Sequence, residues 1–76
     1  MDAYLVMLRH GMDDIPMLLT AVESEAIEFA ERLGPNSGER EKIELGIDAS
    51  MPNCVDVYRF VGGKLCGMNR IKTFDG

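Results

Sequence analysis

Arg9 and His10 are the neighbouring residues in this chain of 76 whose types could most directly do chemistry. They end an apolar run over residues 4–9, and Gly11 follows them, so they stand where a buried strand would enter a turn. An imidazole and a guanidinium at such a place could hold a small ligand or serve a catalytic site, with Arg59 as a further polar group. Such a site is expected at an interface between copies of the chain.

The tripeptide Arg9-His10-Gly11 after an apolar strand resembles the N-terminal motif of the histidine phosphatase (phosphoglycerate mutase-like) superfamily. The resemblance implies that His10 would accept a phosphate group and that Arg9 would help to hold it. That family also uses a second active-site histidine and further arginines in a much larger α/β domain, whereas this chain has one histidine. Because context decides such matches, we interpret both residues as the end of a strand entering a turn.

Other chemical motifs are missing from the sequence. One histidine, two distant cysteines and scattered acids give no metal-ligand spacing. Gly62-Gly63 is typical of a hairpin turn rather than of a phosphate-binding loop. No nucleophile has an evident base beside it. We therefore predict no catalytic residue, no metal site and no cofactor, and we leave enzyme activity open.

The hydrophobic pattern predicts an α+β fold in the order β-β-α-(β)-β-β, with an antiparallel sheet of four strands and one helix on one of its faces. Residues 4–9 and 17–22 predict the first two strands. Residues 25–33 predict an amphipathic helix, with Ser24 as its N-cap. A long helix over 14–33, which would give the order β-α-β-β, also fits the apolar spacing and remains an alternative.

The C-terminal part predicts the clearest element, a hairpin of residues 54–61 and 64–74 around Gly62-Gly63. A regular register across that turn pairs Tyr58 with Gly67 and assigns the face of Tyr58 to the helix. Residues 43–47 alternate between apolar and polar, so a fifth strand at the sheet edge is left open. The length allows one domain, residues 1–76.

Several predicted strands are apolar on both faces, yet one helix covers only one face. The other face needs a cover, which could be a second copy of the chain, the segment 35–53 or a foreign partner. We favour a second copy packed sheet against sheet. The interface residues predicted on this basis are the apolar side chains of one hairpin face and two of the bases around them: Val55, Val57, Val61, Cys66, Met68, Arg59 and Arg70.

The chain carries a net charge of −5, with most acids in its first fifty residues and a basic C-terminal hairpin. Its acidity disfavours nucleic acid, although weak binding through Arg59, Lys64, Arg70 and Lys72 remains an alternative. The apolar run near the N-terminus is too short for a signal peptide or a membrane span, and the two cysteines are typical of reduced thiols. We predict a small cytoplasmic protein that acts by association with itself or with another protein and that does not bind a membrane.

Overall fold

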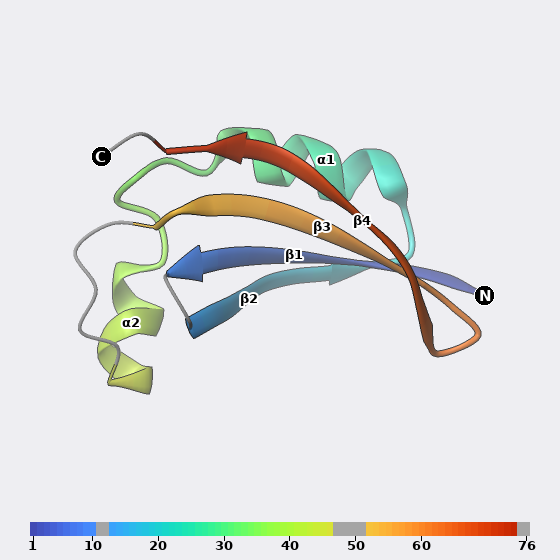
Figure 1. The fold of residues 1–76 in the computed structure, drawn as a ribbon, viewed down its shortest axis with the longest axis horizontal. Helices are drawn as coiled ribbons and strands as arrows, with labels where there is room; N and C mark the ends of the chain where they lie inside the picture. The colour runs from blue at the N-terminus through green and yellow to red at the C-terminus, as the bar shows by residue number, and fades with distance from the viewer. Residues whose placement is uncertain (11–12, 47–51, 75–76) are drawn as a thin grey trace.

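In a computed structural model of the chain, residues 1–10, 13–46 and 52–74 are described, apart from the side chain of His10. The elements, in chain order, are β1 (Asp2–His10), β2 (Asp13–Thr20), α1 (Glu23–Arg32), α2 (Glu39–Leu45), β3 (Cys54–Val61) and β4 (Lys64–Thr73), as Figure 1 shows. The strands form one antiparallel sheet in the order β2-β1-β3-β4. The predicted α+β class and four-stranded antiparallel sheet are confirmed, and β1 and β3 form the centre.

The second predicted strand is confirmed, so the alternative of one helix over 14–33 is wrong. Ile15 precedes a proline and is therefore held in an extended conformation. Pro16 pairs with Met7 and sits in β2, an edge strand, where a missing backbone N–H is tolerated. The register shifts at this point, which makes Met17 the extra residue of a β-bulge.

Helix α1 begins earlier than the sequence indicated. Val22 is its N-cap and makes no side-chain capping bond, so the prediction of Ser24 as the cap is wrong. Thr20 fixes the entry instead, because its hydroxyl accepts a hydrogen bond from the Val22 N–H at 3.2 Å and donates one to Glu25 at 2.9 Å. The predicted apolar stripe is confirmed, since Ala26 and Ala30 are buried against the sheet.

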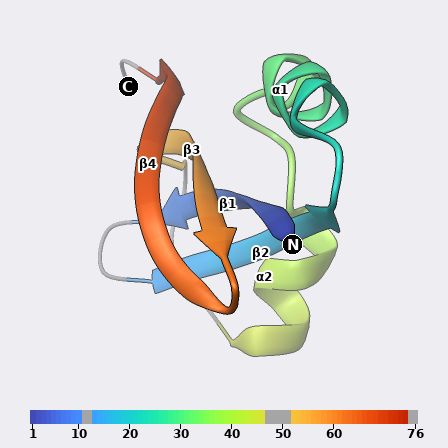
Figure 2. The same cartoon turned by 90° about the vertical axis from the view of Figure 1, so that its right-hand side faces the viewer.

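Residues 39–45 form helix α2, so the part of the segment 43–47 that is described is not a fifth strand. Glu, Arg and Lys in this stretch are good helix formers, and that preference prevails over the short apolar alternation. Gly38 and Gly46 bracket the helix with φ values of 78° and 71°. Both helices lie on the same side of the sheet (Figure 2). Ile47 and residues 11–12, in the turn expected after residues 4–9, lie outside the described residues.

The β3–β4 hairpin turns at Gly62 and Gly63, whose φ values of 58° and 82° suit a type I′ turn. The predicted register holds next to the turn, where Phe60 pairs with Leu65. Two shifts follow, and the first of them already pairs Tyr58 with Met68 rather than with Gly67. In β4 the extra residues of these bulges are Cys66 and Ile71, and each bulge moves the later residues of β4 by one place.

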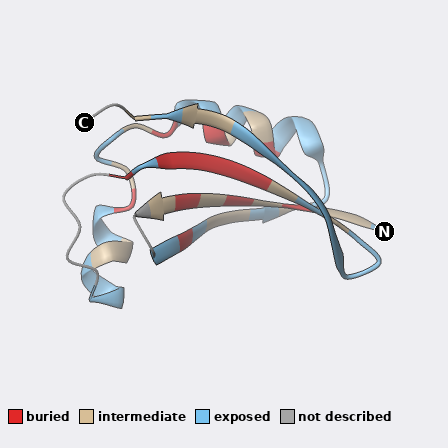
Figure 3. Cartoon of the chain, viewed as in Figure 1, coloured by how far each residue is buried: buried red, intermediate tan, exposed pale blue. Residues whose placement is uncertain are grey.

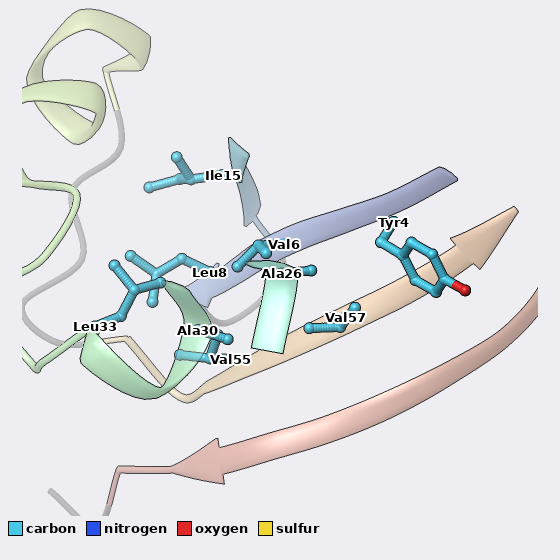
Figure 4. Close-up of a cluster of buried hydrophobic side chains, with 9 residues drawn as sticks. All are labelled: Tyr4, Val6, Leu8, Ile15, Ala26, Ala30, Leu33, Val55 and Val57. Atoms are coloured by element: carbon cyan, nitrogen blue, oxygen red, sulfur yellow. The ribbon is translucent and has the colours of Figure 1, made fainter. Parts of the chain in front are cut away.

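The core lies between α1 and the central strands, as the red segments of Figure 3 show. Its buried members include Val6, Leu8, Val55 and Val57, and Figure 4 shows them gathered around the two alanines of α1. The prediction that Tyr58 faces the helix is therefore wrong. Val55 and Val57 face the helix instead, because the short alanine side chains let the branched valines pack closely. These two valines consequently cannot belong to an interface on the uncovered face.

Candidate functional site

The sheet side opposite α1 and α2, which we call the open face, is covered by no helix of the described chain. Its residues alternate along the strands with those of the core. The strand pairings place on it a mainly apolar set from all four strands: Leu5, Met7, Arg9, Asp14, Leu19, Cys54, Asp56, Tyr58, Phe60, Leu65, Met68 and Arg70.

Apolar side chains are most exposed along the two outer strands of the open face. Leu19 on β2 is 68% exposed, and Leu65 and Met68 on β4 are 58% and 49% exposed. Tyr58 and Phe60 on β3 are half-buried between them. The open face therefore exposes apolar side chains, as expected for the face without a helix. Most of these residues differ from the predicted interface residues.

A polar cluster surrounds Asp56 of β3. It lies at the end of the open face where Arg9 of β1 pairs with Cys54 of β3. Asp56 is fully buried. Arg70 of β4 donates from Nε to Oδ1 at 3.0 Å and from Nη2 to Oδ2 at 3.4 Å. Arg9 of β1 places Nη1 3.8 Å from Oδ2. Both carboxylate oxygens thus have cationic partners, which is what a buried charge requires.

Arg9 links this cluster to the edge strand β2. Its Nε donates to Oδ1 of Asp14 at 3.1 Å, and both side chains are about one third exposed. This arrangement follows from the register, since Arg9 pairs with Asp14 on one side and with Cys54 on the other. The antiparallel sheet thereby brings together residues that lie more than forty positions apart in the sequence.

A hollow of about 270 Å³ lies over the cluster and is lined by Arg9, Asn53, Cys54, Arg70 and Thr73. We call it the arginine hollow. Asp56 does not line it, because its carboxylate lies beneath the two guanidinium groups. The surface presented to solvent is therefore rich in hydrogen-bond donors.

Cys54 borders the hollow but is unsuited to nucleophilic chemistry. Burial and the neighbouring charge of Asp56 raise the pKa of its thiol. The thiol donates to Oδ2 of Asp56 at 3.8 Å. A protonated, buried thiol is a poor nucleophile, so this cysteine has a structural role.

The predicted ligand residues are only partly brought together. Arg9 lines the hollow, whereas Arg59 lies on the helix side and pairs with Asp2 at 3.1 Å. The backbone of His10 ends β1, and its side chain lies outside the described part of the structure. Arg70 was predicted as an interface residue and is the second arginine of the hollow.

Sequence reasoning missed Asp56 and its neighbours Asn53 and Thr73. One signal was available for Asp56, because a carboxylate in the middle of an apolar strand is unfavourable unless a cation meets it. In the regular register Asp56 faces Asn69, and the bulge at Cys66 brings Arg70 opposite to it. The cluster therefore could not be derived from the hairpin turn alone.

The four bases of the C-terminal hairpin do not form one stripe. Lys72 lies on the helix side, where its amine donates to the Leu33 carbonyl at 2.8 Å, at the C-terminus of α1. Arg59 also lies on that side, as its pair with Asp2 shows, whereas Arg70 points to the open face. The pattern of interleaved bases and aromatics that sheet-type RNA binders use is absent from the described strands.

A second hollow runs along the outer surface of α1, lined by Glu28, Glu31 and Arg32. All three residues are exposed, and none is held by the core. Within the described residues, no three or more His, Cys, Asp or Glu side chains are grouped so that they could hold a metal ion. Nor does that part of the chain contain a helix with the length and apolar character needed to span a bilayer.

Comparison of the chain with protein-family models, with curated proteins and with solved structures finds no match. Function must therefore be argued from the open face and the arginine hollow.

Proposed function

We propose that this protein acts by association, and that the partner on its open face is a second copy of the same chain. The observation that carries this proposal is the exposure of Leu19, Leu65 and Met68 on one face, with half-buried aromatic side chains between them. Monomeric proteins seldom leave a continuous apolar surface of this extent in contact with water. Packing two sheets face to face would remove it.

The distribution of charge favours a second copy over a foreign partner. In the described part of the chain, the charged residues of the open face are two arginines and two aspartates, which pair with one another. The acidic residues are concentrated on α1 and α2, on the other side of the sheet. Two open faces can therefore meet without like-charge repulsion between them, whereas a basic partner would be drawn to the helical side.

The size of the face sets the expected affinity. Four strands of about eight residues span roughly 19 by 26 Å, or about 500 Å² for each copy. Two copies would bury on the order of 1,000 Å², which is the lower limit for a specific interface. We therefore expect a dimer with a dissociation constant in the micromolar range.

Light scattering on matched variants tests this proposal. Met68→Glu places a charge among the exposed apolar side chains of the proposed interface and is expected to give a monomer that keeps the circular dichroism of the wild type. Ile43→Glu is the control, since Ile43 on α2 is 82% exposed but lies off the open face. We expect a dimer for the wild type and for Ile43→Glu at 100 µM or more.

A monomeric wild-type protein at that concentration would refute the proposal. So would a dimer that Ile43→Glu dissociates and Met68→Glu leaves intact.

Weak nucleic-acid binding has less support, because the hairpin bases are divided between the two sides of the sheet. The cytoplasm remains our proposed compartment, and two free thiols suit its reducing conditions.

A further inference from the structure

We propose that the arginine hollow binds a small oxyanion, such as the phosphate or carboxylate group of a small molecule. This inference does not depend on pairing of the open face, because all the residues of the hollow come from one chain. It rests on the two guanidinium groups, on the buried carboxylate that positions them and on the size of the hollow.

Arg9 and Arg70 keep donors available beyond their known pairs. A guanidinium carries five N–H donors in a planar fork that suits carboxylate and phosphate oxygens. The ion pairs of the described residues engage Nε and Nη1 of Arg9 and Nε and Nη2 of Arg70. The remaining Nη of each side chain takes part in none of these pairs. The two side chains are 35% and 46% exposed, so solvent and solutes reach them.

Asp56 holds the two arginine side chains in position and is not itself part of the binding surface. Its carboxylate is fully buried and contacts both arginines, so it holds the two cations close together and offsets their mutual repulsion. Side chains already fixed in this way lose less conformational freedom when a ligand binds. None of the described residues that line the hollow carries a carboxylate, and the hydroxyl of Thr73 adds a further donor there.

The size of the hollow selects the class of ligand. Its volume of about 270 Å³ lies just below the range of pockets that enclose whole drug-sized molecules. It can therefore take an anionic group and a few attached atoms. Arg59, which could have added a third cation, lies on the other face, so the described cationic side chains of the site are the two arginines.

Titration with inorganic phosphate, followed by ¹H–¹⁵N NMR at constant ionic strength with chloride as reference, tests the site. We expect saturable shifts of the Asn53, Cys54 and Thr73 amides and of the Nε–H signals of Arg9 and Arg70. The expected dissociation constant is millimolar or tighter. Arg9→Gln should weaken binding at least tenfold, and Arg59→Gln, a matched change on the helix side, should leave it unchanged.

The same titration of Met68→Glu separates this site from the proposed dimer, and binding there should match the wild type. The inference is overturned if phosphate gives no saturable shift, if shifts at Lys64 and Arg59 equal those at the hollow, or if Arg9→Gln binds like the wild type. Loss of binding in a folded Met68→Glu would also overturn it, because a site within one chain does not need a partner. Amide dispersion in each spectrum reports whether the variant is folded.

Discussion

Asp56, Arg9 and Arg70 show how the sheet accommodates a charge in one of its central strands. The carboxylate is fully buried on the open face and contacts two partly exposed arginines, so it is shielded from water without losing its cationic partners. Breaking such a pair is strongly destabilising, whereas its net contribution to stability is small. A role in positioning the two arginines is therefore a better explanation for this cluster than stability.

The two cysteines should differ sharply in reactivity. Cys54 is buried, and burial together with Asp56 raises the pKa of its thiol, so less thiolate forms at any given pH near neutrality. Cys66 is exposed at a bulge of the edge strand β4. In the folded protein at pH 8 we expect Cys66 to react with a thiol reagent at least one hundred times faster than Cys54. A colorimetric disulfide-exchange assay, with and without denaturant, measures both.

Cys66→Ser provides the control, because the folded variant should then release almost no colour until denaturant is added. Equal rates for the two thiols in the native wild type would contradict the buried position of Cys54. They would also contradict its contact with Asp56 and its position at the border of the arginine hollow.

At the scale of elements, the glycines at the two ends of α2 allow the effect of packing on stability to be measured separately from the effect of backbone strain. Both have positive φ values near 75°, where a side chain is strained. A Cβ on Gly38 would lie 2.7 Å from Cδ2 of Leu8, whereas a Cβ on Gly46 would meet nothing within 4 Å. Gly38 thus lets the chain before α2 lie directly on the core.

We therefore expect Gly46→Ala to lower the free energy of unfolding by about 1 kcal/mol, through backbone strain alone. Gly38→Ala should lower it by about 2–4 kcal/mol, because the clash with Leu8 adds an overpacking term. Urea denaturation of both variants measures the difference. Equal losses would show that the segment before α2 does not pack against Leu8.

Much of the fold could be predicted because local signals agree with the final structure. Pro16 favoured a strand over a long helix, Gly62-Gly63 indicated the hairpin turn, and the spacing of Ala26 and Ala30 indicated the buried side of α1. The bulges at Cys66 and Ile71 could not be predicted, since β4 has no strict apolar alternation to fix its register. The helix at 39–45 was missed for a similar reason, because its few apolar residues are exposed and fit a strand equally well.

The choice of the buried face could not be made from the hairpin alone. Both faces of β3 offer apolar residues, with valines on one and aromatic residues on the other. Asp56 was the available signal, because it lies on the aromatic face. If the helix covered that face, the carboxylate of Asp56 would be buried beneath the apolar side of the helix, which is unfavourable. Arg9 was predicted as a ligand residue and does line the arginine hollow. The place of Arg70 in the hollow could not be predicted, because it depends on the register of β4.

On the scale of the whole molecule, the two sides of the sheet differ in both charge and cover. The helices hold most of the acids on one side, and the open face is apolar with internally paired charges. The chain exposes 4944 Å² of surface. A compact monomer of its mass would expose about 4,600 Å². Helix α2 and the open face both contribute exposed apolar side chains to that surface, and a second copy of the chain on the open face would cover those of the sheet.

Isotope-filtered NMR on a mixture of ¹³C-labelled and unlabelled protein tests the pairing of open faces most directly. At a concentration of several hundred micromolar, we predict NOEs between protomers at the methyl groups of Leu5, Leu19 and Met68, and none at Ile43 on α2. Contacts between protomers that are confined to α2, or no such contacts at any concentration reached, would contradict the account.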